Sequence, residues 1–130
     1  MTVQVGRAKA RPSIQTLDAM STLAWLQAWY KRQCNGDWEH SSGVRIDSCD
    51  NPGWWVKINL LGTPLENCAF TEIAEGVDSE RFALGPRWLS CRVDQNTWNG
   101  AGDETKLEPI LELFLDWAEE HDTQPSFNAT

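Results

Sequence analysis

The fold is decided by Val44-Arg-Ile-Asp-Ser-Cys49 and Trp54-Trp-Val-Lys-Ile-Asn-Leu60, two segments that are joined through Asn51-Pro-Gly53. Both segments alternate apolar and polar residues, which is the period of a β-strand with one buried face. Proline followed by glycine at the two central turn positions indicates a type II turn. The sequence therefore predicts an antiparallel hairpin over residues 44–60.

Strand alternation assigns a direction to each side chain of this hairpin and of a further predicted strand, residues 88–94. The expected inward side chains are Val44, Ile46, Val56, Ile58, Leu89, Cys91 and Val93. The expected outward side chains are Arg45, Asp47, Trp55, Lys57, Asn59, Trp88 and Arg92. Two tryptophans among charged residues on an open sheet face would form a patch that needs explanation.

A helix is predicted on the N-terminal side of the strands, over about residues 21–34. Ser21 or Thr22 is expected to cap it, and Asn35-Gly36 is expected to end it. The apolar positions at helical spacing are Leu23, Leu26, Trp29, Tyr30 and Cys34.

A second helix is predicted after the strands, ending at about Asp122. Thr105-Lys-Leu-Glu108 has the pattern of a capping box, and Pro109 falls in the first turn, where proline is tolerated. Its apolar stripe consists of Leu107, Ile110, Leu111, Phe114, Leu115 and Ala118.

The remaining segments complete the predicted fold. A weaker strand is expected at residues 69–73, a polar loop at 75–86, and a second loop after residue 94, in which Trp98-Asn-Gly-Ala-Gly102 forms a turn. This order predicts an α+β fold, in which an antiparallel sheet of three to four strands carries the N-terminal and C-terminal helices on one face.

The domain organisation is predicted to be simple. Residues 1–20 form a flexible basic leader, residues 21–122 a single α+β domain, and residues 123–130 a disordered tail. The leader is not followed by an apolar stretch, so we expect a cytoplasmic protein that is not exported. No run approaches the roughly 18 apolar residues of a membrane span.

Charge and cysteine usage limit the partners. The net charge of −8 disfavours nucleic acid and would steer a basic protein toward this one. The four cysteines include no C-x-x-C pair and only two histidines are present, so we expect reduced thiols, no metal and no cofactor.

Cys34-Asn-Gly-Asp-Trp-Glu-His40 is the first candidate site. Glu39 could orient His40 as a base, but neighbours on an extended segment point to opposite sides, so catalysis is disfavoured here. The structural alternative is that Asp37 or Asn35 caps the turn, Trp38 plugs the edge of the core, and Glu39 and His40 begin a strand.

The second candidate site is the last helix, which carries an acid at every fourth position. Like charges at this spacing repel each other, so a helix selected only for stability would include lysines. Either an acidic recognition ridge or an ordinary solvated face explains the pattern. The acidic positions are Glu104, Glu108, Glu112, Asp116 and Glu120.

Two other classes of function stay open at this point. Cys91-Arg92 would suit a small thiol-dependent enzyme such as a sulfurtransferase, because a nearby cation activates a thiol. Cys91 is expected to face the core, which argues against it. The eight tryptophans would also suit a carbohydrate-binding module.

Several motifs together resemble the immunity protein 53 family of bacterial polymorphic toxin systems, over about residues 23–119. They are Trp25-Leu-Gln-Ala-Trp-Tyr30, Gln33-Cys-Asn-Gly-Asp-Trp-Glu-His40, Asp50-Asn-Pro-Gly-Trp54, Gly100-Ala-Gly102 and the apolar run from Leu107 to Trp117. Asp103-Glu104 departs from the pattern, in which Gly-Pro is expected.

The resemblance implies a small cytosolic protein that is encoded beside a toxin and neutralises it by binding. It implies no catalytic residue. We therefore expect a non-enzymatic protein with a basic protein toxin as its partner, and with neither nucleic acid nor a membrane as a ligand. The candidate contact residues are Asp37, Glu39, His40, Trp55 and Trp88, with Glu108, Glu112 and Asp116 as a rival surface.

Overall fold

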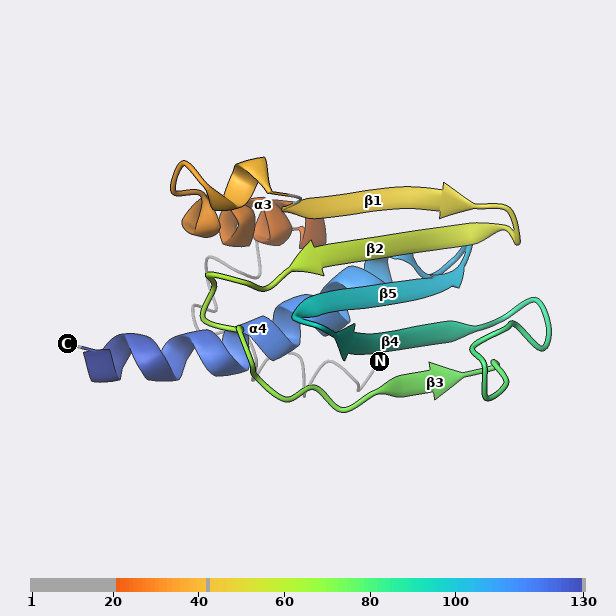
Figure 1. Ribbon diagram of the computed structural model, residues 1–130. Coiled ribbons are helices and arrows are strands. Elements are labelled where there is room, and N and C mark those ends of the chain that lie inside the picture. The colour runs from red at the N-terminus through yellow and green to blue at the C-terminus, as the bar shows by residue number, and fades with distance from the viewer. Residues whose placement is uncertain (1–20, 42, 130) are drawn as a thin grey trace.

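A five-stranded antiparallel sheet carries two helices on one of its faces in the computed structural model, which describes residues 21–41 and 43–129, with side chains as far as His121 (Figure 1). The strand order is β1-β2-β5-β4-β3. The strands are β1 Val44–Cys49, β2 Gly53–Asn59, β3 Ile73–Glu75, β4 Leu89–Asp94 and β5 Thr97–Asp103. The helices are α3 Thr22–Gln33, the short 3-10 helix η1 Trp38–His40, and α4 Leu107–Ala129.

The α+β class and the antiparallel sheet are confirmed, but the number of strands is larger than predicted because β5 was missed. Gln95 and Asn96 both have positive φ, at 52° and 57°, and Asp94 pairs with Thr97. Two residues of this kind form the tight turn that joins hairpin strands. The predicted loop after residue 94 is therefore a turn followed by a strand.

The glycines of β5 provide space for packing. A Cβ on Gly100 would lie 2.6 Å from Ile110 Cγ2 of α4 and 2.7 Å from the ring of Trp98. A larger residue there would require the Ile110 side chain or the Trp98 ring to shift. Trp98-Asn-Gly-Ala-Gly102 therefore forms most of the strand between β2 and β4, and its prediction as a turn is wrong.

The hairpin of β1 and β2 is confirmed, with Val44 opposite Ile58 and Cys49 opposite Gly53. The predicted type II turn is wrong, because the Asn51–Pro52 peptide bond is cis and Gly53 belongs to β2. Glycine is required at position 53 because a Cβ would collide with the carbonyl oxygen of Gly102.

The third strand in sequence order lies later than predicted, at Ile73–Glu75. The residues before it pack against the middle of α4. The carbonyl of Ala69 accepts a hydrogen bond from Trp117 Nε1 at 2.9 Å, and the Phe70 ring packs edge-on against Trp117 at 5.1 Å. Residues 69–70 therefore serve the core, and pairing with β4 begins at Ile73.

Helix α3 begins as predicted, since Ser21 Oγ accepts a hydrogen bond from Ala24 N at 3.1 Å. Its buried face is rotated from the predicted one. Leu23 is 59% exposed and Tyr30 is 39% exposed, because the larger side chains of neighbouring turns occupy the core. The buried residues are Thr22, Trp25, Leu26, Trp29 and Gln33.

Helix α4 buries the predicted apolar stripe, with Phe114 at its centre and Leu107 partly buried. The predicted capping box is wrong. The Thr105 hydroxyl donates to Asp103, and the Glu108 carboxylate accepts from Thr22 in α3. The helix also continues beyond Asp122, at which its end was predicted.

The predicted leader, residues 1–20, lies outside the described residues, and the disorder of residues 123–130 stays a prediction. Within the described part of the chain, no helix is both long and apolar enough to cross a membrane.

The predicted inward residues Val56, Ile58, Leu89 and Cys91 are buried, whereas Val44 and Val93 are half-buried. Ile46 is an exception at 38% exposure. It lies on the edge strand β1, whereas α4 packs against β2 and β5. We call the face of the sheet opposite α3 and α4 the open face, and no helix of the described part of the chain covers it (Figure 1).

Candidate functional site

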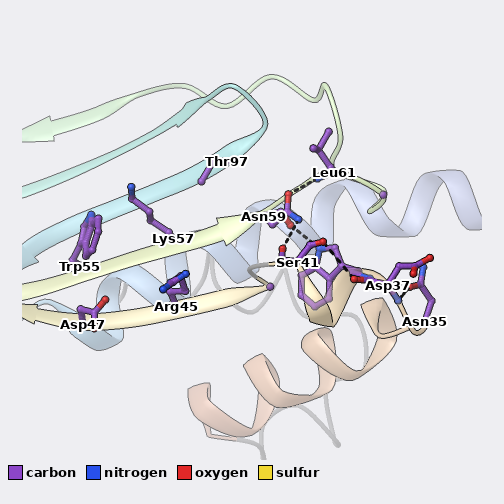
Figure 2. Close-up of a pocket in the computed structure, with 13 residues that line it drawn as sticks. Asn35, Asp37, Ser41, Arg45, Asp47, Trp55, Lys57, Asn59, Leu61 and Thr97 are labelled. Carbon is purple, nitrogen blue, oxygen red and sulfur yellow. Dashed lines mark hydrogen bonds between the residues drawn. The ribbon is translucent and has the colours of Figure 1, made fainter.

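The open face contains a groove of about 940 Å³ (Figure 2). Arg45 and Asp47 of β1 and Trp55 and Lys57 of β2 line it along the sheet. Residues of the loop 35–41 close one end. We call this the open-face groove.

Strand register brings these side chains together. Arg45 pairs with Lys57 and Asp47 with Trp55 across β1 and β2. Trp55 and Lys57 alternate with the buried Val56 and Ile58, so they point toward the open face. Arg45 and Asp47 lie directly opposite them on β1 and therefore share that face. The Lys57 Nζ atom lies 4.5 Å from the centroid of the Trp55 ring, in a cation–π contact that orients both side chains.

The loop at the end of the groove is held by its own side chains. Asn35 Oδ1 accepts hydrogen bonds from the amides of Asp37 and Trp38, at 2.9 and 3.0 Å. The Trp38 indole is 4% exposed and donates to the carbonyl of Asn59 at 2.9 Å. The predicted roles of Asn35 as a cap and of Trp38 as a plug at the core edge are confirmed.

Glu39 has a structural task in this loop. Its carboxylate accepts hydrogen bonds from the amides of Asn35 and Gly36, at 2.9 and 2.8 Å. Hydrogen bonds from its own backbone amide and from those of Asn35 and Gly36 lower the pKa of Glu39. Glu39 and His40 lie in η1, so the prediction that they begin a strand is wrong.

The open-face groove unites only part of the first candidate set. Asp37 and Trp55 line it, and Trp55 is 39% exposed. His40 is exposed but is not among the residues that line the groove. Trp88 lies on the open face as predicted, because it lines a hollow there, but it is only 7% exposed, so its predicted exposure is wrong.

Trp88 is buried at the start of β4. Its amide donates to Asp103 Oδ2 at 2.8 Å, and its ring lies beside Gly53 of β2. It lines a second hollow of about 170 Å³, together with Trp55, Lys57, Arg81 and Arg92. Trp88 therefore forms a wall of the open face and offers little surface to a partner.

The acidic face of α4 forms a separate surface. The Thr22 hydroxyl lies 2.9 Å from Glu108 Oε2 and 3.2 Å from Glu112 Oε2, so α3 partly covers this face. Glu112 and Asp116 are half-buried. Helix α4 covers the inner face of the sheet, so these acids and the open-face groove do not form one contact surface (Figure 1).

The most tightly bonded charged group is one that the sequence reasoning did not select. Asp103 is fully buried at the end of β5 and accepts hydrogen bonds from Arg87 Nη1 at 2.7 Å and from Lys106 Nζ at 2.8 Å. It also accepts from the Trp88 amide and from the Thr105 amide and hydroxyl. The sequence did contain a sign of this residue's importance, because Asp103-Glu104 stands where the family pattern has Gly-Pro.

The pKa of Asp103 reflects two opposing effects. Burial acts to raise it, whereas hydrogen bonds from Lys106, Thr105 and Trp88 lower it and prevail, so the pKa lies well below its usual value. Asp103 joins the start of β4, the end of β5 and the start of α4. Its role is structural.

Two exposed apolar side chains were also missed. Phe82 is 65% exposed and Leu84 is 70% exposed, in the loop between β3 and β4 that the sequence suggested was simply polar. The two apolar residues, spaced two apart within a polar stretch, could have been recognised in the sequence as exposed.

The thiols give little support to an enzyme. All four cysteines are free, and Cys91 is fully buried in β4. Burial and the negative charge of Glu75 raise the pKa of Cys91 to about 12. A thiol with this pKa is almost entirely protonated at neutral pH and is a poor nucleophile. In the described part of the chain, no three potential metal ligands gather at one place.

We expect Cys91 to resist alkylation while the protein is folded. Iodoacetamide at pH 8 should leave Cys91 unmodified for hours, because the thiol is protonated and inaccessible, and should modify it within minutes in 8 M urea. Peptide mass spectrometry measures both rates, and the half-buried Cys49 provides the internal comparison. Rapid labelling of Cys91 in the folded protein would contradict this assignment and revive the thiol-enzyme hypothesis.

Among the comparisons with known proteins, a family model gives a match over most of the chain. No curated protein and no solved structure matches it. The model of the family described as Immunity protein 53 matches residues 23–119. This match extends from α3 to α4 and includes every strand of the sheet. The chain therefore belongs to the immunity protein 53 family.

Proposed function

We propose that this protein is a non-enzymatic immunity protein that binds a cognate polymorphic toxin in the open-face groove and thereby protects the producing cell. Family membership supports the immunity role in general. The proposed position of the binding site rests on one observation, the exposure of Trp55 in a groove of about 940 Å³.

Trp55 has the properties of a binding anchor. Six of the eight tryptophans are buried and Trp54 is partly buried, so Trp55 is the indole that the core does not use. Tryptophan is enriched among the residues that dominate interface energies. The groove provides charged groups of both signs around this ring, at Arg45, Asp47 and Lys57, and these groups can fix the orientation of a bound partner.

The overall charge supports a toxin with a basic surface. A net charge of −8 produces a long-range attraction for a positively charged protein and speeds the encounter. We place this encounter in the cytoplasm of the producing cell. The acidic face of α4 is the rival docking surface, although the carboxylates of Glu108 and Glu112 already accept hydrogen bonds from the Thr22 hydroxyl.

The test is the affinity of the chain for the product of the neighbouring toxin gene, carrying an inactivating substitution. We expect Trp55→Ala to weaken binding about 30-fold or more, since truncation of a central aromatic anchor costs at least about 2 kcal/mol. Isothermal titration calorimetry measures this, and circular dichroism establishes that the variant is folded.

Two control variants locate the surface. Leu23→Ala removes an exposed apolar side chain of α3, on the opposite side of the sheet from the open face, and it should leave the affinity within about 3-fold of the wild type. Glu108→Gln tests the rival face of α4. Normal binding by folded Trp55→Ala together with weak binding by Glu108→Gln would place the toxin on α4. The immunity role itself is rejected if the unmodified chain does not bind the toxin.

A further inference from the structure

Three cations cross the open face in one line, although the chain as a whole is acidic. Arg45 of β1 pairs with Lys57 of β2, Lys57 pairs with Asn99 of β5, and Asn99 pairs with Arg92 of β4. The line spans four adjacent strands. We call Arg45, Lys57 and Arg92 the cationic row.

This arrangement is unfavourable for the sheet alone. Like charges directly opposite each other on neighbouring strands destabilise their pairing, and Arg45 and Lys57 are such a pair. Arg92 has a compensating contact, since its Nη1 lies 3.3 Å from Asp94 Oδ2. Among the described residues, no ion pair is formed by Arg45 or Lys57. Two cations without an ion pair among the described residues therefore remain beside the exposed ring of Trp55, with Asp47 as the neighbouring acid.

A hollow between Lys57 and Arg92 adds a third arginine, Arg81, which also forms an exposed ion pair with Glu72 at 3.4 Å. It encloses about 170 Å³ and includes Arg81 and Ser90 in its lining. Within the described part of the chain, no carboxylate lines it. The hollow is large enough for a carboxylate side chain with its water molecules.

We infer that an acidic segment of the toxin lies across the open face, with carboxylates at the cationic row and an apolar side chain against Trp55. This inference rests on the proposed function and specifies the chemistry of its partner at the contact. The long-range attraction depends on the charge of the whole chain, whereas the dissociation rate depends on the groups in contact. A toxin with a basic surface overall can therefore present carboxylates here.

Carboxylates fit this face better than the phosphates of a nucleic acid. Asp47 lies beside Trp55 in the open-face groove, and Asp94 is paired with Arg92, so acids interrupt the positive region. A nucleic acid presents a charge at every nucleotide and would meet these acids as well as the net charge of −8. Separate carboxylates on a protein segment can be placed at the cations alone.

The first experiment compares two charge reversals that change the net charge equally. Lys57→Glu alters the cationic row, and Lys31→Glu alters an exposed position in the last turn of α3. Both variants become more negative by two charges, so the long-range attraction changes to the same extent. We expect Lys57→Glu to weaken binding of the inactivated toxin about 30-fold or more, and Lys31→Glu to remain within about 3-fold of the wild type.

A second variant tests the cationic row in case Lys57→Glu fails to fold. Lys57 is half-buried, whereas Arg45 is exposed and its reversal leaves the core untouched. Arg45→Glu should also weaken binding, by about 10-fold. If the wild type binds and both reversals bind equally well, the inference fails while the proposed function stands. If the wild type does not bind, the proposed function fails, and the toxin is excluded as the occupant.

The second experiment identifies the chemistry without the toxin. The probes are a decapeptide of alternating glutamate and leucine, its glutamine counterpart and a single-stranded RNA decamer, each titrated while amide NMR shifts are recorded. We expect saturable shifts at residues 45, 57 and 92 with the glutamate peptide, and their loss in Lys57→Glu. Equal shifts with the glutamine peptide, no shifts with any probe, or tighter binding of the RNA would overturn the inference.

Discussion

Asp103→Asn is expected to lower the free energy of unfolding by about 3 kcal/mol at pH 7, because it replaces a buried carboxylate that accepts several hydrogen bonds from charged groups, each worth about 1.5–3 kcal/mol. The carboxylate is fully buried between Arg87 and Lys106. Asparagine keeps the shape and part of the hydrogen bonding but removes the negative charge beside both cations, of which, among the described residues, only Arg87 keeps another ion pair, with Glu104. Urea unfolding followed by circular dichroism measures the difference.

The effect of Asp103→Asn should also depend on pH. The folded-state pKa of Asp103 lies below the unfolded-state value of about 3.9, so the charged carboxylate stabilises the folded protein. This stabilisation is complete above about pH 5 and is lost as the pH falls below about 4. The stability gap between wild type and variant should therefore shrink from pH 5 to pH 2.5.

Glu104→Gln is the matched control for Asp103→Asn. Glu104 also bonds to Arg87, at 3.0 Å, but in an exposed pair. Its substitution should leave the protein close to wild-type stability, because exposed ion pairs contribute little. Equal effects of the two substitutions, or a gap that does not change with pH, would mean that Asp103 does not have the role that its contacts indicate.

Trp98→Ala is expected to have a similar effect, lowering the free energy of unfolding by about 3–5 kcal/mol, because it leaves a large cavity in the core. The Trp98 indole is fully buried in β5 and packs edge-on against Phe114 at 5.3 Å and Phe70 at 5.8 Å. It therefore connects the central strand to α4. Urea unfolding, again followed by circular dichroism, provides the measurement.

Two other variants test whether the loss of stability comes from the buried position of Trp98. Trp55→Ala removes the same side chain from the open face and should cost much less stability, because Trp55 is 39% exposed. Trp98→Phe should be intermediate, since it keeps ring contacts and removes an indole N–H that has no hydrogen-bond partner among the described residues. If Trp98→Ala and Trp55→Ala were equally stable, β5 would not occupy the centre of the core.

The elements with a strong period were predicted well. The hairpin of β1 and β2, the start of α3 and the apolar stripe of α4 follow from the spacing of apolar residues, which depends only on local geometry. Strand β5 has no such pattern. Asn99, Gly100 and Gly102 are poor strand formers, and they are favoured here only because β2, β4 and α4 surround them.

The candidate site was predicted only in part, for the same reason. Alternation along β2 correctly turned Trp55 and Lys57 toward the open face. The burial of Trp88 depends on Asp103 and Gly53, which are distant in sequence, so no local pattern could reveal it. The cationic row likewise requires β5, which places Asn99 between Lys57 and Arg92.

The sequence by itself determined the class of fold, the family and the outward direction of Trp55, because periodicity and motifs are properties of neighbouring residues. Only the tertiary structure decided which tryptophans stay exposed, which acids form hydrogen bonds or ion pairs, and which cations align across the sheet. Those properties arise from strand order and register, through which residues far apart in the chain become neighbours.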